Sequence, residues 1–204
     1  CYQLNVFEKS PLAKYIANGK LPAAADTAQK ADMFAKSVEV LTAHQWHRLS
    51  NNHWRQTNRE RNIYNELGKS ACDCLAFGCG AGGRLKGYGF MMNRSLADWS
   101  AGVDAGLKPV MVMTAPGPNW ALLRTVSSDM ESGAINLPCI SERFGVDVDA
   151  LTREVTSQWE EAGLVTRTGD WLVQTVAGQF WHVTLAQLLV DLIGKALRKE
   201  AMAA

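Results

Sequence analysis

The sequence lacks an excess of charge of either sign: 21 lysines and arginines stand against 20 aspartates and glutamates in 204 residues. A chain of this balance has no global field that attracts nucleic acid or an anionic membrane. It also lacks an apolar run of the roughly 18 residues that a membrane span requires. Residues 180–197 come nearest, and His182, Gln187 and Asp191 interrupt them. We therefore expect neither a nucleic-acid partner nor a membrane span.

The cysteines do not form the even framework of a secreted disulfide protein. There are five, and three of them, Cys72, Cys74 and Cys79, lie within eight residues. An odd, clustered set is more typical of a reducing compartment, so we predict a cytoplasmic protein. Small buried core residues are the usual outcome for such cysteines, and we expect no metal site in this chain.

The sequence also opens without an initiator methionine and without a charged and then apolar leader. Cys1 leads directly into residues 2–7, whose alternating pattern and strand-forming side chains favour a β-strand. We interpret the chain as one that starts midway in a longer protein.

What the sequence does have is a 47% apolar content, enough for the core of one large or two small domains. In the first half, apolar residues at spacings of three, four and three predict an amphipathic helix over residues 27–43. Short strands are predicted at residues 47–50 and 74–77, with a polar loop at residues 51–61. Strands that alternate with helices indicate an α/β protein, whose parallel sheet presents its chemistry on loops at the strands' C-terminal ends.

The second half favours helices, and prolines and glycines between Pro109 and Pro118 punctuate the chain there. We place a domain boundary near residue 95, which divides the chain into residues 1–94 and residues 95–204.

Within the second half, a helix is predicted to begin at the capping residue Asp147 and to end at Gly163. A hairpin around residues 168–170 and a long helix from near Thr175 follow. Helix, hairpin and helix resemble a winged helix, but the helix before the hairpin is acidic, so we interpret it as structural. Its expected buried stripe consists of Leu151, Val155, Trp159 and Ala162.

The densest local signal is the glycine loop at residues 77–83, Phe-Gly-Cys-Gly-Ala-Gly-Gly, which would let backbone N–H groups approach a ligand closely. It satisfies G-x-G-x-x-G, but a dinucleotide site needs a helix here, and residues 86–89 are poor helix sequence. It also looks like the glycine motif of classical methyltransferases, except that Ala76 stands where an acidic residue is usual. A glycine-rich turn without a ligand is the remaining interpretation.

Seven short motifs, taken together, resemble HemN-like radical S-adenosylmethionine proteins in their order and spacing. The tail at residues 164–167 and 172–175 resembles the C-terminal domain of the same family. The resemblance implies the closing strands and helices of a partial (β/α) radical-SAM barrel, followed by a mostly helical domain with a winged-helix-like hairpin. The seven motifs lie at residues 2–6, 10–14, 19–21, 31–34, 50–51, 61–65 and 77–83.

Residues 59–65, Arg-Glu-Arg-Asn-Ile-Tyr-Asn, together with the glycine loop, look most like the haem-utilisation branch called HutW or ChuW. The implied reaction is anaerobic, radical-initiated methyl transfer to haem, with opening of the ring and release of iron. Coproporphyrinogen III dehydrogenases and HemW-type haem chaperones are the alternatives. Chaperone-like relatives tend to have His-Asn-x-x-Tyr-Trp where this chain has Arg61 to Asn65.

The resemblance also implies cofactors and partners. Radical chemistry in this family needs S-adenosylmethionine and a 4Fe-4S cluster held by a C-x-x-x-C-x-x-C run, which is absent here. We therefore expect the cluster upstream of this chain, and the chain alone to be inactive. Haem or a related tetrapyrrole is the expected substrate, and a low-potential donor such as flavodoxin the expected source of electrons.

Two groups of site residues follow. By resemblance, a second S-adenosylmethionine would contact residues near Tyr64 and in the glycine loop: Asn62, Ile63, Tyr64, Asn65, Gly78, Gly80, Gly82 and Gly83. The haem candidates lie in the polar loop: His53 as an iron ligand, Trp54 as a stacking ring, and Arg55 and Arg59, with Arg61, as partners of the propionates. A solvated loop, and a packed aromatic at Tyr64, remain the plainer interpretations.

Overall fold

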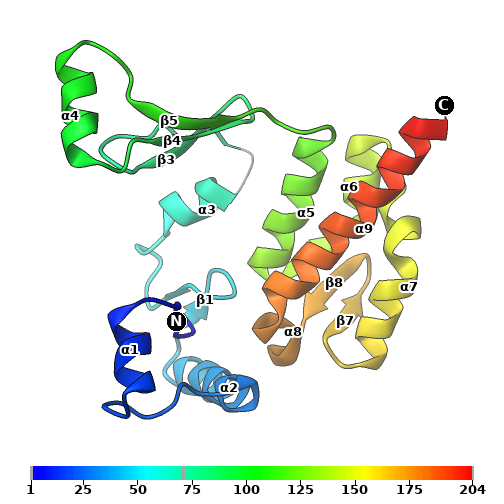
Figure 1. The fold of residues 1–204 in the computed structure, drawn as a ribbon. Helices are drawn as coiled ribbons and strands as arrows, with labels where there is room; N and C mark the ends of the chain where they lie inside the picture. Colours follow the sequence, from blue (N-terminus) through cyan, green and yellow to red (C-terminus); the bar gives the residue numbers. More distant parts are fainter. Residues whose placement is uncertain (1, 70–71, 204) are drawn as a thin grey trace.

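The computed structural model describes residues 2–69 and 72–203. Figure 1 shows three groups of elements: an N-terminal group, a small sheet with one helix, and a C-terminal helical domain. The helices are α1 (Pro11–Ala17), α2 (Thr27–Ala43), α3 (Ile63–Lys69), α4 (Leu96–Asp104), α5 (Trp120–Ser132), α6 (Leu137–Phe144), α7 (Val148–Glu161), α8 (Val176–Phe180) and α9 (His182–Ala203). The strands are β1 (His47–Arg48), β2 (Trp54–Arg55), β3 (Gly82–Leu85), β4 (Tyr88–Met92), β5 (Val110–Thr114), β6 (Ala134–Asn136), β7 (Val165–Thr168) and β8 (Trp171–Gln174).

The strands form three small sheets: β1 with β2, β3 with β4 and β5, and β6 with β8 and β7. The described residues form both helices and strands, which confirms the predicted mixed α/β composition. Every pairing among the described strands is antiparallel, so the expected parallel arrangement is not found. Residues 2–7 form no strand, and Tyr2 and Phe7 are about three-quarters exposed. The reason is that a strand needs a neighbouring strand to hydrogen-bond, and no described strand pairs with this segment.

The predicted helix over residues 27–43 is confirmed as α2. Asp26 accepts a hydrogen bond from the backbone N–H of Gln29, whose side chain accepts one from the N–H of Asp26, so a capping box fixes where the helix begins. The expected apolar face of α2 is only half-buried; its members are Ala31, Phe34, Val38 and Leu41.

Of the two predicted short strands, one is present and one is not. Residues 47–48 form β1, and the segment expected to be a loop supplies its partner, β2. Residues 74–77 make only an isolated bridge between Cys74 and Arg84, and Phe77 is 85% exposed. The predicted buried strand at residues 74–77 is therefore wrong. Its apolar residues lie along the edge of a small sheet, and no other described element buries them.

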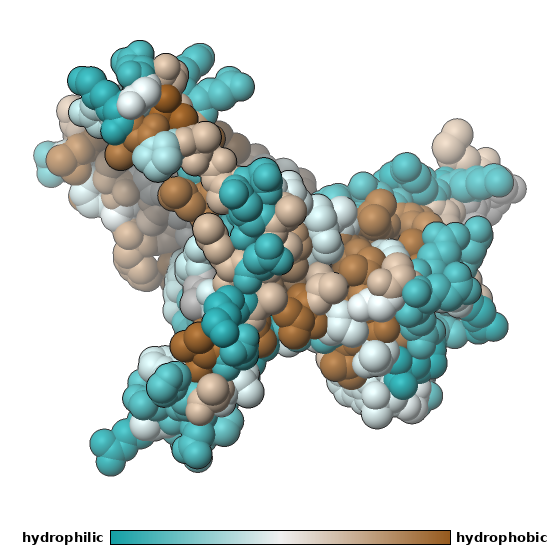
Figure 2. Space-filling view, turned by 90° about the horizontal axis from the view of Figure 1, so that it is seen from below, coloured by the Kyte–Doolittle hydropathy of each residue, from teal (hydrophilic) through white to brown (hydrophobic). Residues whose placement is uncertain are grey.

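The buried core lies wholly in the C-terminal half of the described chain, between residues 122 and 193. In Figure 1, α5, α9 and α7 surround the sheet of β6, β7 and β8. Figure 2 shows apolar side chains at the surface in separate patches. The core consists of Leu122, Val126, Met130, Ile135, Leu137, Ile140, Val148, Trp159, Val165, Leu172, Leu185, Ala186, Leu189 and Ile193.

The predicted order of helix, hairpin and helix is present as α7, β7–β8 and the terminal helices. Asp147 caps α7, and Gly163 follows its end with a φ of 70°. The buried stripe of α7 differs from the predicted one, since it contains Thr152 and Thr156 with Val148 and Trp159. Each threonine hydroxyl bonds back to a carbonyl of its own helix, which permits burial and which hydrophobic spacing does not reveal. The terminal helix is divided at Trp181 into α8 and α9.

Sheet pairing bears on the domain boundary. β5 pairs with β4, so the β3–β4–β5 sheet includes residues on both sides of position 95. Two prolines, Pro116 and Pro118, then separate β5 from α5. We propose that the boundary lies at residues 115–119.

Within the described chain, no helix has the length and apolar character to cross a membrane.

Candidate functional site

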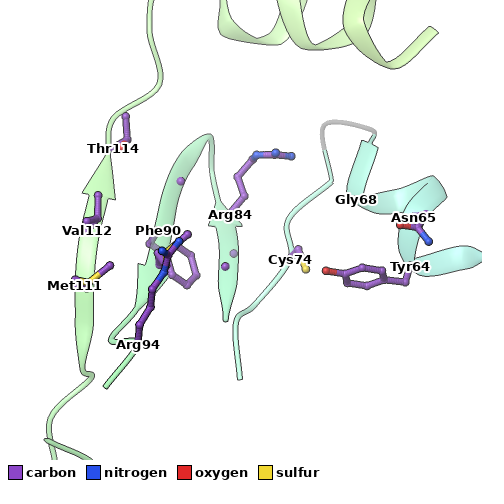
Figure 3. A pocket seen from close by; sticks show the side chains of 14 residues that line it. Tyr64, Asn65, Gly68, Cys74, Arg84, Phe90, Arg94, Met111, Val112 and Thr114 are labelled. Carbon is purple, nitrogen blue, oxygen red and sulfur yellow. The ribbon is translucent and has the colours of Figure 1, made fainter. Parts of the chain in front are cut away.

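An open cleft of about 730 Å³ lies between α3 and one face of the β3–β4–β5 sheet (Figure 3). We call it the sheet cleft. Its walls come from α3, the segment before β3, all three strands and the residues that follow β4. The lining residues are Tyr64, Asn65, Gly68, Cys74, Gly82, Gly83, Arg84, Gly89, Phe90, Met91, Arg94, Met111, Val112 and Thr114.

The register of the sheet explains which side chains reach this face. Gly82 lies opposite Met91, Arg84 lies opposite Gly89, and Gly89 lies opposite Thr114. Paired residues share a face and alternate residues along a strand point the same way. A Cβ atom built on Gly89 would meet nothing within 4 Å, and one on Gly82 would meet only the carbonyl oxygen of Phe90 at 3.9 Å. The face is therefore a bare platform, because two of its positions carry no side chain.

The turn between β3 and β4 explains how the chain forms this platform. Lys86 and Gly87 both have positive φ angles, 48° and 82°. Two successive residues of this kind produce the tight hairpin turn that matches the twist of antiparallel strands. The glycine loop thus leads into a β-hairpin.

On the other wall, Tyr64 extends from the first turn of α3 toward Cys74 (Figure 3). Asn65 donates from Nδ2 to Oδ1 of Asn62 at 2.7 Å, and the backbone oxygen of Asn62 accepts from the N–H groups of Asn65 and Glu66. Asn62 therefore starts the helix that carries Tyr64. Ile63 is 53% exposed and does not line the sheet cleft.

The glycine loop divides into two parts. Gly78 and Gly80 have φ angles of 103° and 71° and form the turn that precedes β3. The N–H of Gly80 donates to the carbonyl oxygen of Asn93 at 2.8 Å, so the fold already uses this donor. Of the four predicted glycines, Gly82 and Gly83 line the sheet cleft, and Gly78 and Gly80 do not.

The chain enters a strand after the glycine loop, where a dinucleotide site would have a helix N-terminus to bind phosphate. This observation agrees with the sequence argument against a dinucleotide site.

Two arginines, Arg84 and Arg94, line the sheet cleft, and no carboxylate is among its described lining residues. Arg94 is exposed and its Nε contacts Sδ of Met91 at 3.2 Å. The guanidinium of Arg84 lies 5.6 Å from the centre of the Trp120 ring. Burial, and then the charge of Arg84, lower the pKa of Arg124, and Glu131 opposes this shift. An anionic ligand group would be favoured beside these guanidiniums.

The predicted haem candidates lie elsewhere, and none of them lines the sheet cleft. Nδ1 of His53 lies 2.7 Å from the Ser50 hydroxyl, and Nε2 lies 2.6 Å from the Tyr2 hydroxyl. Both ring nitrogens are therefore within hydrogen-bond distance of protein groups, and an iron atom would have to displace one. His53 lines a separate cavity of about 230 Å³ with Arg61 and Asn62.

The other three candidates are placed as follows. The guanidinium of Arg48 covers the ring of Trp54 at 4.4 Å. Arg55 is half-buried beside it in β2, and Arg59 is exposed. The structure brings the predicted cofactor residues Tyr64, Asn65, Gly82 and Gly83 together and leaves this group apart from them.

Sequence reasoning missed most of the residues that line the sheet cleft. The residues that it missed include both arginines and the apolar platform, namely Arg84, Gly89, Phe90, Met91, Arg94, Met111, Val112 and Thr114. The signal that could have found them is the pair Lys86 and Gly87 between two short strand-like runs, which is typical of a hairpin.

The described residues offer no ligand set for an iron-sulfur cluster. No three of their histidine, cysteine, aspartate or glutamate side chains gather to hold a metal. Cys72 is exposed, and Cys74 and Cys79 are half-buried. Cys1 lies outside the described residues.

The sequence matches no model of a known protein family. Among curated proteins, the anaerobilin synthase of Escherichia coli O157:H7 is 35% identical over 193 residues. This chain is a homologue of that synthase. The match covers 94% of the chain and 42% of the synthase, so the chain spans less than half of its relative.

Among solved structures, the fold matches one described as coproporphyrinogen III oxidase (HemN) from Escherichia coli, a radical SAM enzyme. The TM-score is 0.64, with 14% sequence identity, over 81% of this chain and 42% of that one. At this identity the likeness concerns the fold. The sequence match and the fold match together confirm the predicted resemblance to HemN-like radical S-adenosylmethionine proteins and their haem-utilisation branch.

Proposed function

We propose that this chain is the C-terminal part of a radical S-adenosylmethionine enzyme that degrades haem without oxygen. The observation that carries the proposal is the 35% identity to an anaerobilin synthase along 94% of the chain. The reaction of the complete protein would be methyl transfer to haem, opening of the ring and release of iron. Such an enzyme works in the cytoplasm and takes electrons from a low-potential donor such as flavodoxin.

S-adenosylmethionine supplies the methyl group when it is bound. The sheet cleft has groups that suit its ribose or adenine and its carboxylate. The hydroxyl of Tyr64 and Oδ1 of Asn65, whose Nδ2 already donates to Asn62, lie on the α3 side, where they can hydrogen-bond to ribose or adenine. Gly82 carries no side chain, so a ligand can approach the strand backbone. Arg84 supplies a cation for the carboxylate.

The 4Fe-4S cluster has no such place among the described residues, because they contain no cluster of ligands. We assign it to a part of the complete protein outside this chain. The chain alone is then expected to bind haem or S-adenosylmethionine and to perform no radical chemistry. Reconstitution of the isolated chain with iron and sulfide checks this: a brown protein with four irons per chain would contradict it.

Haem turnover by the complete protein tests the proposal. The protein is incubated with haem, S-adenosylmethionine and a strong reductant in the strict absence of oxygen. A linear, methylated tetrapyrrole in the mass spectrum and released iron trapped by a chelator are the expected products. Haem that stays bound and intact would favour a HemW-type carrier.

Coproporphyrinogen III as the substrate in the same assay tests the other enzyme alternative, a coproporphyrinogen III dehydrogenase. Loss of carbon dioxide from its propionates, with no change to haem, would identify a dehydrogenase of the coproporphyrinogen type. Transfer of a labelled methyl group from S-adenosylmethionine by the isolated chain tests the methyltransferase alternative, because binding of S-adenosylmethionine alone is expected under both hypotheses.

A further inference from the structure

Two residues of α5 contact the two walls of the sheet cleft. Trp120 and Arg124 lie one helical turn apart, so they share a face of α5. The buried residues Leu122, Val126 and Met130 lie on the other side of the same helix. α5 therefore packs into the buried core with one face and leaves the face of Trp120 and Arg124 for other contacts.

Arg124 contacts the α3 wall. Its Nη2 donates a hydrogen bond of 2.6 Å to the backbone oxygen of Gly68, although 56 residues separate the two. Gly68 belongs to the end of α3 and lines the sheet cleft. α3 has only seven residues, and none of residues 63–68 is buried. A helix this short is not stable on its own, so its position depends on contacts such as the one with α5, beside which it lies in Figure 1.

Trp120 contacts the sheet wall. The guanidinium of Arg84, on β3, lies 5.6 Å from the centre of the Trp120 ring, which is within the range of cation–π attraction. The turn between β3 and β4 packs here as well. A Cβ atom on Gly87 would lie 3.5 Å from Cε3 of Trp120 and 3.0 Å from Cβ of Pro116. The start of α5 therefore contacts both the strand and the turn of this hairpin.

We propose that Trp120 and Arg124 are positioning residues, which set the separation of the two walls of the sheet cleft and so the fit of the cofactor between them. The buried core holds α5, and α5 in turn holds α3 through Arg124 and β3 through Trp120. The groups of α3 and β3 that face the cofactor then keep a fixed spacing. This inference rests on the proposed function, because it takes S-adenosylmethionine as the ligand of the cleft.

Arg124→Met in the 204-residue chain tests the α3 wall. Methionine keeps an unbranched apolar stem and loses the donor to Gly68. S-adenosylmethionine affinity, measured by calorimetry, should fall about tenfold, as expected for the loss of a hydrogen bond from a charged group. Arg124→Lys keeps a cationic donor without the planar guanidinium, so it should recover most of that affinity.

Trp120→Leu tests the sheet wall, because it removes the ring beside Arg84. S-adenosylmethionine affinity should fall about threefold. Matched controls are Arg153→Met on α7 and Trp171→Leu on β8, which make the same kinds of change at exposed positions. Both controls should leave the affinity unchanged.

A double-mutant cycle separates positioning from a general loss of stability. Arg124 acts through α3, so Arg124→Met should weaken binding by a smaller factor when Asn65→Ala has already removed a contact on that wall. Trp120→Leu acts through the other wall, and its effect should be nearly the same with and without Asn65→Ala. A loss of stability that does not act through α3 would make the effects of Arg124→Met and Asn65→Ala additive.

The outcomes separate this inference from the proposed function. Undiminished S-adenosylmethionine affinity in both Arg124→Met and Trp120→Leu overturns the inference, and so does strict additivity of Arg124→Met with Asn65→Ala. Absence of S-adenosylmethionine binding by the wild-type chain also overturns it. A complete protein that leaves haem intact in the turnover assay refutes the proposed reaction and not the calorimetric result.

Discussion

Nδ2 of Asn51 donates a hydrogen bond to Oε1 of Gln174 at 3.0 Å, although 123 residues separate the two along the chain. The same nitrogen donates to the carbonyl oxygen of Met130 at 3.0 Å, and the backbone N–H of Asn51 donates to that of Glu131 at 3.1 Å. Asn51 is only 1% exposed. One buried amide therefore anchors the N-terminal β1–β2 hairpin in the helical core.

Replacement of Asn51 should lower the free energy of unfolding by more than the size of its side chain suggests. Asn51→Ala leaves Oε1 of Gln174 without this donor in a buried place, which costs about 1–3 kcal/mol. Urea denaturation measures the loss. Asn58 is exposed in the same half of the chain, and Asn58→Ala should stay within about 0.5 kcal/mol of wild type. Equal effects of the two variants would show that the anchor contributes nothing.

Two neighbouring glycines should differ in how strongly the same substitution destabilises the protein. A Cβ on Gly83 would lie 2.7 Å from both the carbonyl oxygen of Cys74 and Cζ of Phe90, whereas one on Gly82 meets only an atom at 3.9 Å. Gly83→Ala should therefore destabilise by about 1–3 kcal/mol, and Gly82→Ala by much less. Thermal unfolding of the pair decides. If Gly82→Ala is the worse variant, the packing of the segment at residues 74–76 on β3 is wrong.

Elements whose determinants are local could be predicted from the sequence. Asp26 and Gln29 lie three residues apart and fix the start of α2; Asp147 and Gly163 mark the ends of α7. Capping and turn chemistry of this kind depends on neighbouring residues, so the sequence contains it in full.

Elements whose determinants lie far apart in the sequence could not be predicted from it. Residues 2–7 have the composition of a strand, but a strand forms only beside another strand, and composition does not name the neighbour. His53 looked like an available ligand because its partner Tyr2 is 51 residues away. The sheet cleft combines predicted residues such as Tyr64 with unpredicted ones such as Arg94, since only the register of the sheet brings them together.

Arg48 links the N-terminal hairpin to the core by its shape as well as its charge. Its guanidinium lies 4.4 Å from the Trp54 ring centre and donates to Oε1 of Gln179. Burial lowers the pKa of Arg48, yet a guanidinium keeps its proton at neutral pH. Arg48→Lys retains the charge and loses the planar stacking, so we expect a loss of about 1 kcal/mol.

Chemical denaturation of Arg48→Lys measures this loss, and limited proteolysis should show faster cleavage near the hairpin. Arg153, exposed on α7, provides the matched control Arg153→Lys, which should change neither quantity. An Arg48→Lys protein as stable as wild type would show that charge alone suffices.

Asp129 should make the protein less stable as the pH rises. Burial raises the pKa of its carboxyl, and Arg143 only partly opposes this. Between the ordinary aspartate pKa of about 3.9 and the raised value, the folded state binds more protons than the unfolded state, so the free energy of unfolding falls with increasing pH. Asp129→Asn removes the charged form. The variant should be more stable at pH 7, by less than about 1 kcal/mol because the carboxyl is only half-buried, and the gain should vanish below about pH 4.

Urea denaturation of wild type and Asp129→Asn at several pH values between 3.5 and 7 measures this dependence. Asp104, exposed at the end of α4, gives the control Asp104→Asn, which should not reproduce the pattern. A loss of stability in Asp129→Asn at pH 7 would mean that the attraction of Arg143 outweighs the cost of burying the carboxylate. The sign of one difference at neutral pH therefore decides which of the two effects dominates at this position.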